Sequence, residues 1–158
     1  MKQFSIARRA TILLSVALLT ACASGVKLDD VDGKGGTDYS SQPWNDPKSP
    51  LFKRSVYFDF DSYAVKPEYQ ATLQAHANYL KANKDRKIKI EGNTDERGTT
   101  EYNLALGQRR SEAVRKSLSL LGVPDSQMEA VSFGKEKPKA QGSNEAAWKE
   151  NRRADIAY

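Results

Sequence analysis

The chain has one cysteine, one histidine and no long hydrophobic run, and each of these shortages excludes a class of function. A single cysteine, Cys22, allows no internal disulfide and no CxxC metal or redox site. A single histidine, His76, allows no cluster of histidine ligands and no H-E-x-x-H zinc motif. The sequence therefore predicts no metal and no other cofactor, and His76 is expected to pack rather than to react.

The longest apolar run lies between residues 10 and 19, behind the basic residues Lys2, Arg8 and Arg9. About ten apolar residues are too few to span a bilayer as a helix. A basic start followed by a short apolar run is typical of an export signal. Residues 1–21 are therefore predicted to be a signal peptide.

The signal ends in Leu19-Thr20-Ala21-Cys22, which resembles the lipobox of exported bacterial lipoproteins. This resemblance implies cleavage before Cys22 and acylation of its thiol, and several acyl chains together hold a protein stably on a membrane. Because Ala23 rather than an aspartate follows the cysteine, the resemblance points to the outer membrane. The alternative is a signal run that ends at a cysteine by chance.

The positive charge of the chain is concentrated in the signal. The whole chain has a net charge of +5, and without residues 1–21 it holds 22 basic and 20 acidic residues, a net charge of +2. So small a charge gives little electrostatic support for nucleic-acid binding. We therefore expect no nucleic-acid partner.

Residues 22–53 are predicted to form the lipidated cysteine and a flexible linker, because glycine and proline recur there without apolar periodicity. Trp44 is the exception, and we expect it to lie against the domain that follows. Residues 54–158 are predicted to form that domain, which is large enough to fold alone.

Hydrophobic periodicity predicts an α+β domain with the element order β-α-β-α-β-(α)-β. Alternating residues indicate strands at 56–60, 87–91, 130–133 and 153–158. Helices are expected from Pro67 to about residue 80, over 100–121 and over 144–149, the last one capped by Ser143. This order predicts a mixed sheet with helices packed on it.

Arg110 is the residue that does not fit the predicted helix 100–121. On a helical wheel with Leu106 at 0°, Arg110 falls at about 40° and Asn103 at about 60°, within the apolar face. A guanidinium that faces a core must be paired and hydrogen-bonded, or it is strongly destabilising. Asp95, in the turn before the helix, is the nearest candidate partner.

Two interpretations of this pair remain open. In the first, Arg110 and Asp95 form a buried salt bridge that fixes the loop. In the second, they are the cationic and anionic walls of a pocket for a zwitterion: Arg110 forks a carboxylate and Asp95 accepts an ammonium. Asn103 would add an amide contact, and Phe60 and Tyr102 would form an apolar rim.

Motifs between residues 93 and 153 match those of a known family in order. They are Asn93–Thr99 (N-T-D-E-R-G-T), Tyr102-Asn103, Leu106-Gly107, Arg109-Arg110, Ala113-Val114 and Asn151-Arg152-Arg153. With the lipobox and the opening V-Y-F-D-F-D at 56–61, the chain resembles the OmpA-like peptidoglycan-binding domains, and among them the peptidoglycan-associated lipoproteins. Asn93 departs from the histidine of many relatives and cannot carry a charge.

The resemblance implies non-covalent capture of the peptidoglycan stem peptide through its meso-diaminopimelate. The family's ligand-binding residues map onto Phe60, Asp61, Asp95, Tyr102, Asn103, Arg110 and Arg152. The family further implies binding of TolB and TolA, an outer-membrane location with the domain in the periplasm, and a role in envelope constriction.

Two other functions are weighed against this tether. A wall hydrolase is disfavoured because no nucleophile–base pair is evident, and the paired Asp59 and Asp61 are expected to cap a loop. A wall-anchoring part of a motor or transporter is disfavoured because such proteins have a true membrane-spanning helix, whereas the apolar run here is short.

Overall fold

The sheet is mixed, with the strand order β1-β4-β2-β3 in a computed structural model that describes residues 42–158. β2 runs parallel to β3 and antiparallel to β4, and β4 runs antiparallel to β1. The elements are β1 (Ser55–Tyr57), η2 (Pro67–Tyr69), α1 (Gln70–Ala82), β2 (Ile88–Asn93), α2 (Thr100–Leu120), η3 (Asp125–Gln127), β3 (Met128–Gly134), α3 (Glu145–Asn151) and β4 (Arg153–Ala157). The predicted α+β class and mixed sheet are confirmed.

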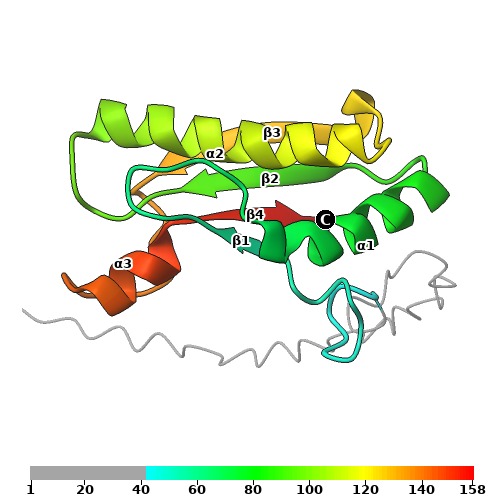
Figure 1. The fold of residues 1–158 in the computed structure, drawn as a ribbon, viewed down its shortest axis with the longest axis horizontal. Helices are drawn as coiled ribbons and strands as arrows, with labels where there is room; N and C mark the ends of the chain where they lie inside the picture. The colour runs from blue at the N-terminus through cyan, green and yellow to red at the C-terminus, as the bar shows by residue number, and fades with distance from the viewer. Residues whose placement is uncertain (1–41) are drawn as a thin grey trace, which may run out of the picture. The chain divides into compact units, whose positions relative to one another are not determined.

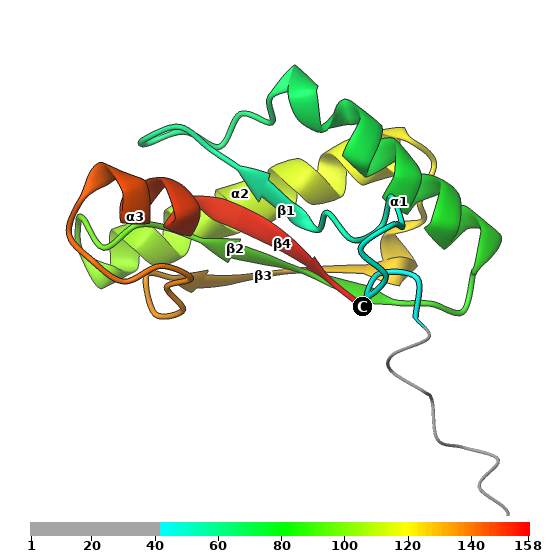
Figure 2. The same cartoon turned by 90° about the horizontal axis from the view of Figure 1, so that it is seen from below.

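α1 and α2 cover one face of this sheet, as Figures 1 and 2 show. The core lies between the sheet and these two helices. It contains side chains that are at most 1% exposed: Ile90 and Ile156 from the central strands, Leu80 from α1, and Val114 and Leu118 from α2. Within residues 42–158, no helix is long and apolar enough to cross a membrane.

The first strand is shorter than its alternating pattern predicts. Val56 and Phe58 are buried as expected, but β1 ends at Tyr57 and Phe60 is 61% exposed. The chain turns after Phe58, and Asp61 adopts a positive φ of 53°, which bends the backbone out of the strand direction. The prediction of a strand over 56–60 is therefore wrong beyond residue 57.

The other elements follow the predicted order, with small differences at their ends. β3 begins two residues earlier than predicted, at Met128. α3 is capped by Asn144, whose side-chain oxygen accepts from the backbone N–H of Ala147 at 3.0 Å, so the predicted cap at Ser143 is wrong. Either residue type caps helices well, so the pattern alone did not distinguish them.

Residues 42–53 fold against the domain, although the sequence assigned them to the linker. Trp44 is 7% exposed and stacks on Tyr158 with ring centroids 4.3 Å apart, which confirms the packing expected for it. His76 is also buried and has a packing role, as predicted. Its Nδ1 is hydrogen-bonded to the Tyr158 hydroxyl at 2.7 Å, and its Nε2 to the Lys53 carbonyl oxygen at 2.9 Å. The ordered chain thus begins before Arg54. The predicted signal peptide, Cys22 and the first part of the linker lie outside the described residues.

α2 approaches β2 closely at two glycines. A Cβ at Gly92 would lie 1.8 Å from the carbonyl oxygen of Gly107, and a Cβ at Gly107 would lie 2.3 Å from Oγ of Ser132. No side chain fits at either position without moving the backbone or its neighbours. The absence of both side chains brings the first half of α2 down onto the end of β2, where the predicted site residues lie.

Candidate functional site

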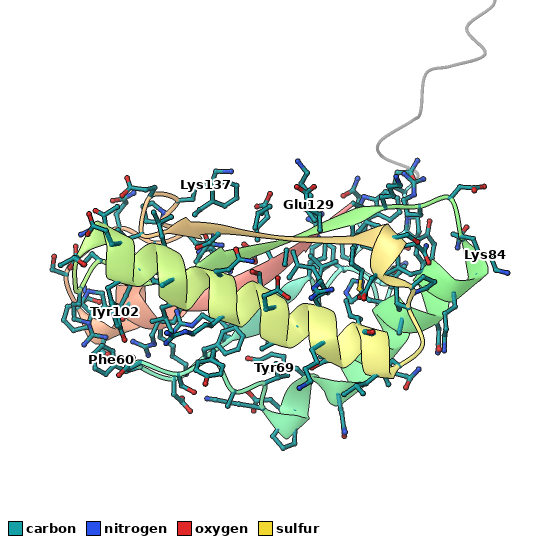
Figure 3. The ribbon with its side chains drawn as sticks, turned by 90° about the horizontal axis from the view of Figure 1, so that it is seen from above. Phe60, Tyr69, Lys84, Tyr102, Glu129 and Lys137 are labelled. Carbon is teal, nitrogen blue, oxygen red and sulfur yellow. The ribbon has the colours of Figure 1, made fainter. Side chains whose placement is uncertain are left out.

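The predicted site residues gather at one end of the domain, where β2 ends and α2 begins. Figure 3 shows Phe60 and Tyr102 together at this end, far from Lys84. The hydroxyl of Thr99 caps α2 by accepting from the backbone N–H of Tyr102 at 3.2 Å. Because α2 starts there, Asn103 falls in its first turn and Arg110 lies two turns later on the same face.

Arg110 is completely buried and joins two parts of the backbone through three carbonyl oxygens. Its guanidinium donates to the carbonyl oxygens of Asp59 at 3.1 Å and Ser62 at 2.9 Å, both in the loop after β1. It also donates to the carbonyl oxygen of Asn93, at the end of β2, at 2.9 Å. Burial lowers the pKa of Arg110 to about 10, and the negative charge of Asp95 opposes this shift. The group therefore stays charged at neutral pH.

The salt bridge between Arg110 and Asp95 that the first interpretation predicts is not formed. The carboxylate of Asp95 is bonded to Arg97 and Arg152 instead. Arg110 is satisfied by backbone carbonyls, which carry no side-chain signal in a sequence, so its partners were not predictable from residue types. The expectation that the buried guanidinium is hydrogen-bonded is nevertheless confirmed.

Asp95 is a buried carboxylate held by two cations. It is 5% exposed; Nε of Arg97 lies 3.2 Å from its Oδ1, and Nη2 of Arg97 lies 2.5 Å from its Oδ2. Nη1 of Arg152 lies 3.4 Å from Oδ2. Burial acts to raise the pKa of Asp95, but the bonds from Arg97 and Arg152 outweigh it, and the pKa lies below its usual value. Asp95 is therefore ionised at neutral pH.

Arg152 supports Asp95 from outside the cavity. Besides Asp95, it donates to the carbonyl oxygen of Phe58 at 3.2 Å and to the carboxylate of Glu145 at 2.6 Å. Its position thus links the end of β1, the loop before α2 and the start of α3. Arg152 is the one predicted site residue that the structure does not place on the cavity wall.

The other six predicted residues line a single cavity. Its wall is made by Phe60, Asp61, Asp95, Tyr102, Asn103 and Arg110, with Thr94, Arg97 and Leu106 between them. The cavity has a volume of about 20 Å³, which is room for about one water molecule. On this wall, the Tyr102 hydroxyl donates to the carboxylate of Asp61. The side-chain amide of Asn103 donates to the carbonyl oxygen of Arg97 at 2.9 Å and fixes the loop.

Arg97 and Trp148 are among the residues at this site that the sequence analysis missed. The guanidinium of Arg97 lies between two aromatic rings, 4.1 Å from the ring centre of Phe60 and 4.0 Å from that of Trp148. The indole N–H of Trp148 donates to the carboxylate of Glu96 at 3.0 Å. Arg97 could have been found from its place two residues after Asp95. Trp148 gave no such signal, because α3 reaches the site only through the fold.

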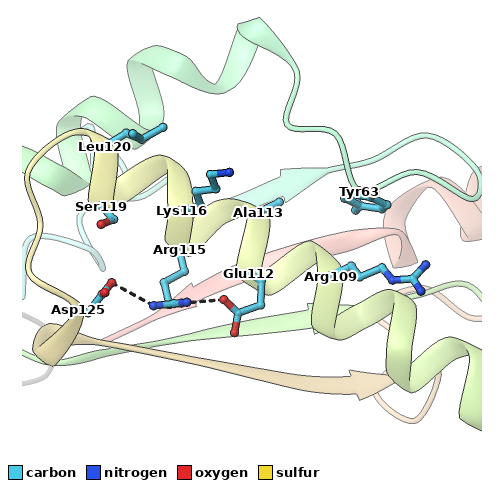
Figure 4. Close-up of a pocket in the computed structure, with 9 residues that line it drawn as sticks. All are labelled: Tyr63, Arg109, Glu112, Ala113, Arg115, Lys116, Ser119, Leu120 and Asp125. Atoms are coloured by element: carbon cyan, nitrogen blue, oxygen red, sulfur yellow. Dashed lines mark hydrogen bonds and ion pairs between the residues drawn. The ribbon is translucent and has the colours of Figure 1, made fainter.

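A larger hollow lies along the outer side of α2, with a volume of about 660 Å³ (Figure 4). None of the predicted site residues lines it. Its two carboxylates, on Glu112 and Asp125, are both paired with Arg115, as the dashed lines show. It is an open groove in which both carboxylates are bonded to the same arginine. We therefore place the candidate site at the small cavity, where buried charges of both signs meet.

The described residues hold no group of three or more histidine, cysteine, aspartate or glutamate side chains that could bind a metal ion. The chemistry that the small cavity offers is recognition of charge. One wall carries the carboxylate of Asp95, another the guanidinium of Arg110, and aromatic rings lie at the rim. Groups of this kind bind ligand charges of the opposite sign through charge-assisted hydrogen bonds.

Comparison with known proteins agrees with the α+β fold described above. The sequence model described as the OmpA family matches residues 57–152. A crystal structure of the peptidoglycan-associated lipoprotein from Burkholderia pseudomallei is 70% identical in sequence, with a TM-score of 0.72, over 74% of this chain and 99% of that one. The C-terminal domain of MotB from Helicobacter pylori, 22% identical with a TM-score of 0.59 over 64% of this chain and 79% of that one, shares the fold alone.

Similar proteins with curated names show to which group within the OmpA family the chain belongs. The peptidoglycan-associated lipoprotein of Pasteurella multocida is 48% identical over 91% of this chain and 92% of its own length. That of Pseudomonas putida is 38% identical over 99% of both chains. The chain therefore belongs to the OmpA family, and within it to the peptidoglycan-associated lipoproteins.

Replacing Arg110 by methionine tests its role as a buried hydrogen-bond donor. Arg110→Met keeps much of the side-chain volume but leaves three carbonyl oxygens without their donor. We expect a loss of about 3–5 kcal/mol in the free energy of unfolding, measured by urea denaturation. The control, Arg115→Met, removes a partly exposed guanidinium and should cost about 1 kcal/mol or less. Equal losses in the two variants would contradict the role assigned to Arg110.

Proposed function

We propose that the domain binds peptidoglycan non-covalently through the side-chain end of meso-diaminopimelate in the stem peptide. That end carries an ammonium and a carboxylate. The observation that carries the proposal is a single cavity lined by buried charges of both signs, Asp95 and Arg110. Asp95 would accept the ammonium. Arg110 uses three of its five N–H donors on backbone carbonyls, which leaves two for a carboxylate.

The proposed role is binding without catalysis. The two aspartates that would be candidates for acid–base work are both occupied. Asp59 is paired with Lys66 at 2.6 Å, and Asp61 accepts from the hydroxyl of Tyr102. The names of the relatives, which describe association with peptidoglycan, support the binding role.

A co-sedimentation experiment with purified peptidoglycan sacculi tests this proposal. We would use a soluble chain that starts at residue 23, as wild type and as Asp95→Asn, which removes the charge and keeps the shape. The variant should lose at least about tenfold in affinity, because an amide does not balance the ligand's ammonium. Thermal melting of each protein would confirm that it is folded.

The control for this experiment is Asp125→Asn, which also removes one aspartate charge but lies in the groove along α2. It should bind sacculi as wild type does. If Asp95→Asn is folded and binds equally well, the site is wrongly assigned. If wild type does not bind sacculi, the proposed function itself fails.

We further propose that Cys22 carries lipid and anchors the chain in the outer membrane, with the domain in the periplasm. Support comes from the lipobox and from the relatives, which are lipoproteins by name. Mass spectrometry of the mature protein should find an N-terminal cysteine with acyl chains, and Cys22→Ser should abolish the modification. An unmodified N-terminus elsewhere in the chain would contradict the anchor.

The lipoprotein is also proposed to act with TolB and TolA in the Tol-Pal system, which maintains the envelope and assists its constriction at division. Family membership supports this part of the proposal. The soluble chain that starts at residue 23, mixed with purified TolB, should elute as a complex in gel filtration. Separate elution at micromolar concentrations would argue against the partnership.

A further inference from the structure

Arg97 occupies the place at Asp95 that a ligand cation would need. Its side chain meets both carboxylate oxygens of Asp95, and its backbone N–H donates to Oδ1 at 3.1 Å. The cavity beside this pair has a volume of only about 20 Å³. An ammonium that binds Asp95 must therefore displace the guanidinium of Arg97, since there is no room for both.

The surroundings of Arg97 leave it little compensation once it is displaced. Glu145, a nearby carboxylate, is already bonded to Arg152 at 2.6 Å. Glu96 accepts the indole N–H of Trp148. The rings of Phe60 and Trp148 hold the guanidinium near the cavity by cation–π contact, which is weaker than a charge-assisted bond to a carboxylate.

Because of these contacts, displacement of Arg97 from Asp95 is less favourable for one kind of ligand than for another. A ligand end with only an ammonium replaces one ion pair at Asp95 by another and leaves Arg97 without a carboxylate. A zwitterionic end replaces the same pair and brings a carboxylate that the displaced Arg97 can bind.

We propose that Arg97 determines the specificity of the site, by blocking Asp95 against simple cations and yielding only to a zwitterion whose carboxylate it then binds. This inference rests on the proposed function, in which Arg110 also faces the ligand's carboxylate, and it adds Arg97 as a second group that favours a zwitterion. In the ligand-free protein Arg97 is thus a substitute for the ligand's ammonium.

The test compares two tripeptides that differ by a single carboxylate. The diaminopimelate side chain of L-Ala-γ-D-Glu-meso-diaminopimelate ends in a zwitterion, whereas the lysine side chain of L-Ala-γ-D-Glu-L-Lys ends in an ammonium alone. Calorimetric titration of wild type should show at least tenfold preference for the first. Arg97→Gln should bind the lysine peptide more tightly than wild type does and show a smaller preference for the diaminopimelate peptide, with the remainder due to Arg110. Arg97→Lys keeps a cation beside Asp95 and should restore part of the lost preference.

Arg115→Gln is the matched control. Its side chain has the same exposed fraction as that of Arg97, 33%, and it too is paired with carboxylates. Removing the charge of Arg115 should leave the preference for the diaminopimelate peptide unchanged. A general electrostatic effect would instead change the preference in both Arg97→Gln and Arg115→Gln.

The possible outcomes separate this inference from the proposed function. An unchanged preference in Arg97→Gln would overturn the inference while leaving the site in place. Loss of both peptides in a folded Arg97→Gln protein would also overturn it, because Arg97 would then be an ordinary contact to the shared part of the ligand. Failure of wild type to bind either peptide would overturn the proposed function, and the inference with it.

Discussion

The candidate site depends on the hydrogen bonds that the buried guanidinium of Arg110 makes to three backbone carbonyl oxygens. The guanidinium draws together the loop after β1 and the end of β2, and it does so from the middle of α2. The close approach at Gly92 and Gly107 allows the helix to reach that position. Since three carbonyl oxygens satisfy the charge, Asp95 is left to other partners. The site therefore presents a carboxylate and a guanidinium that face one cavity without neutralising each other directly.

Local periodicity predicted most of the fold, because strands and helices of this domain bury one face each. It also located Arg110, since a charged residue inside an apolar helical face is visible without any tertiary information. It failed at Phe60, where alternation continues in the sequence but the backbone turns and Asp61 takes a positive φ. A turn of this kind depends on contacts made after folding, and the pattern of apolar residues does not contain it.

The contacts of the site were less predictable than its members. Six of the predicted residues line one cavity. The direct salt bridge expected between two of them, Arg110 and Asp95, is nevertheless not formed. Arg110 bonds to backbone carbonyls, and Asp95 bonds to Arg97 and Arg152. Trp148 joins the site from α3, far along the chain. Partners of this kind are brought together by topology, so residue spacing does not indicate them.

The candidate site lies far from the first residues of the domain. Trp44, near the start of the described chain, packs against Tyr79, in the last turns of α1, and lies under Arg86, in the loop between α1 and β2. Figure 3 shows Lys84, close to this point, at the opposite end of the domain from Phe60 and Tyr102. The cavity and the first described residues therefore lie at opposite ends of the domain.

The most direct test of the account is to map where a stem peptide binds. Chemical shifts of ¹⁵N-labelled protein, titrated with L-Ala-γ-D-Glu-meso-diaminopimelate, would report each backbone amide separately. The account predicts the largest changes at Thr94–Gly98 and at Tyr102 and Asn103, with little change at Lys116 and Leu120. Changes concentrated in the groove along α2, with the residues around Asp95 unaffected, would contradict it.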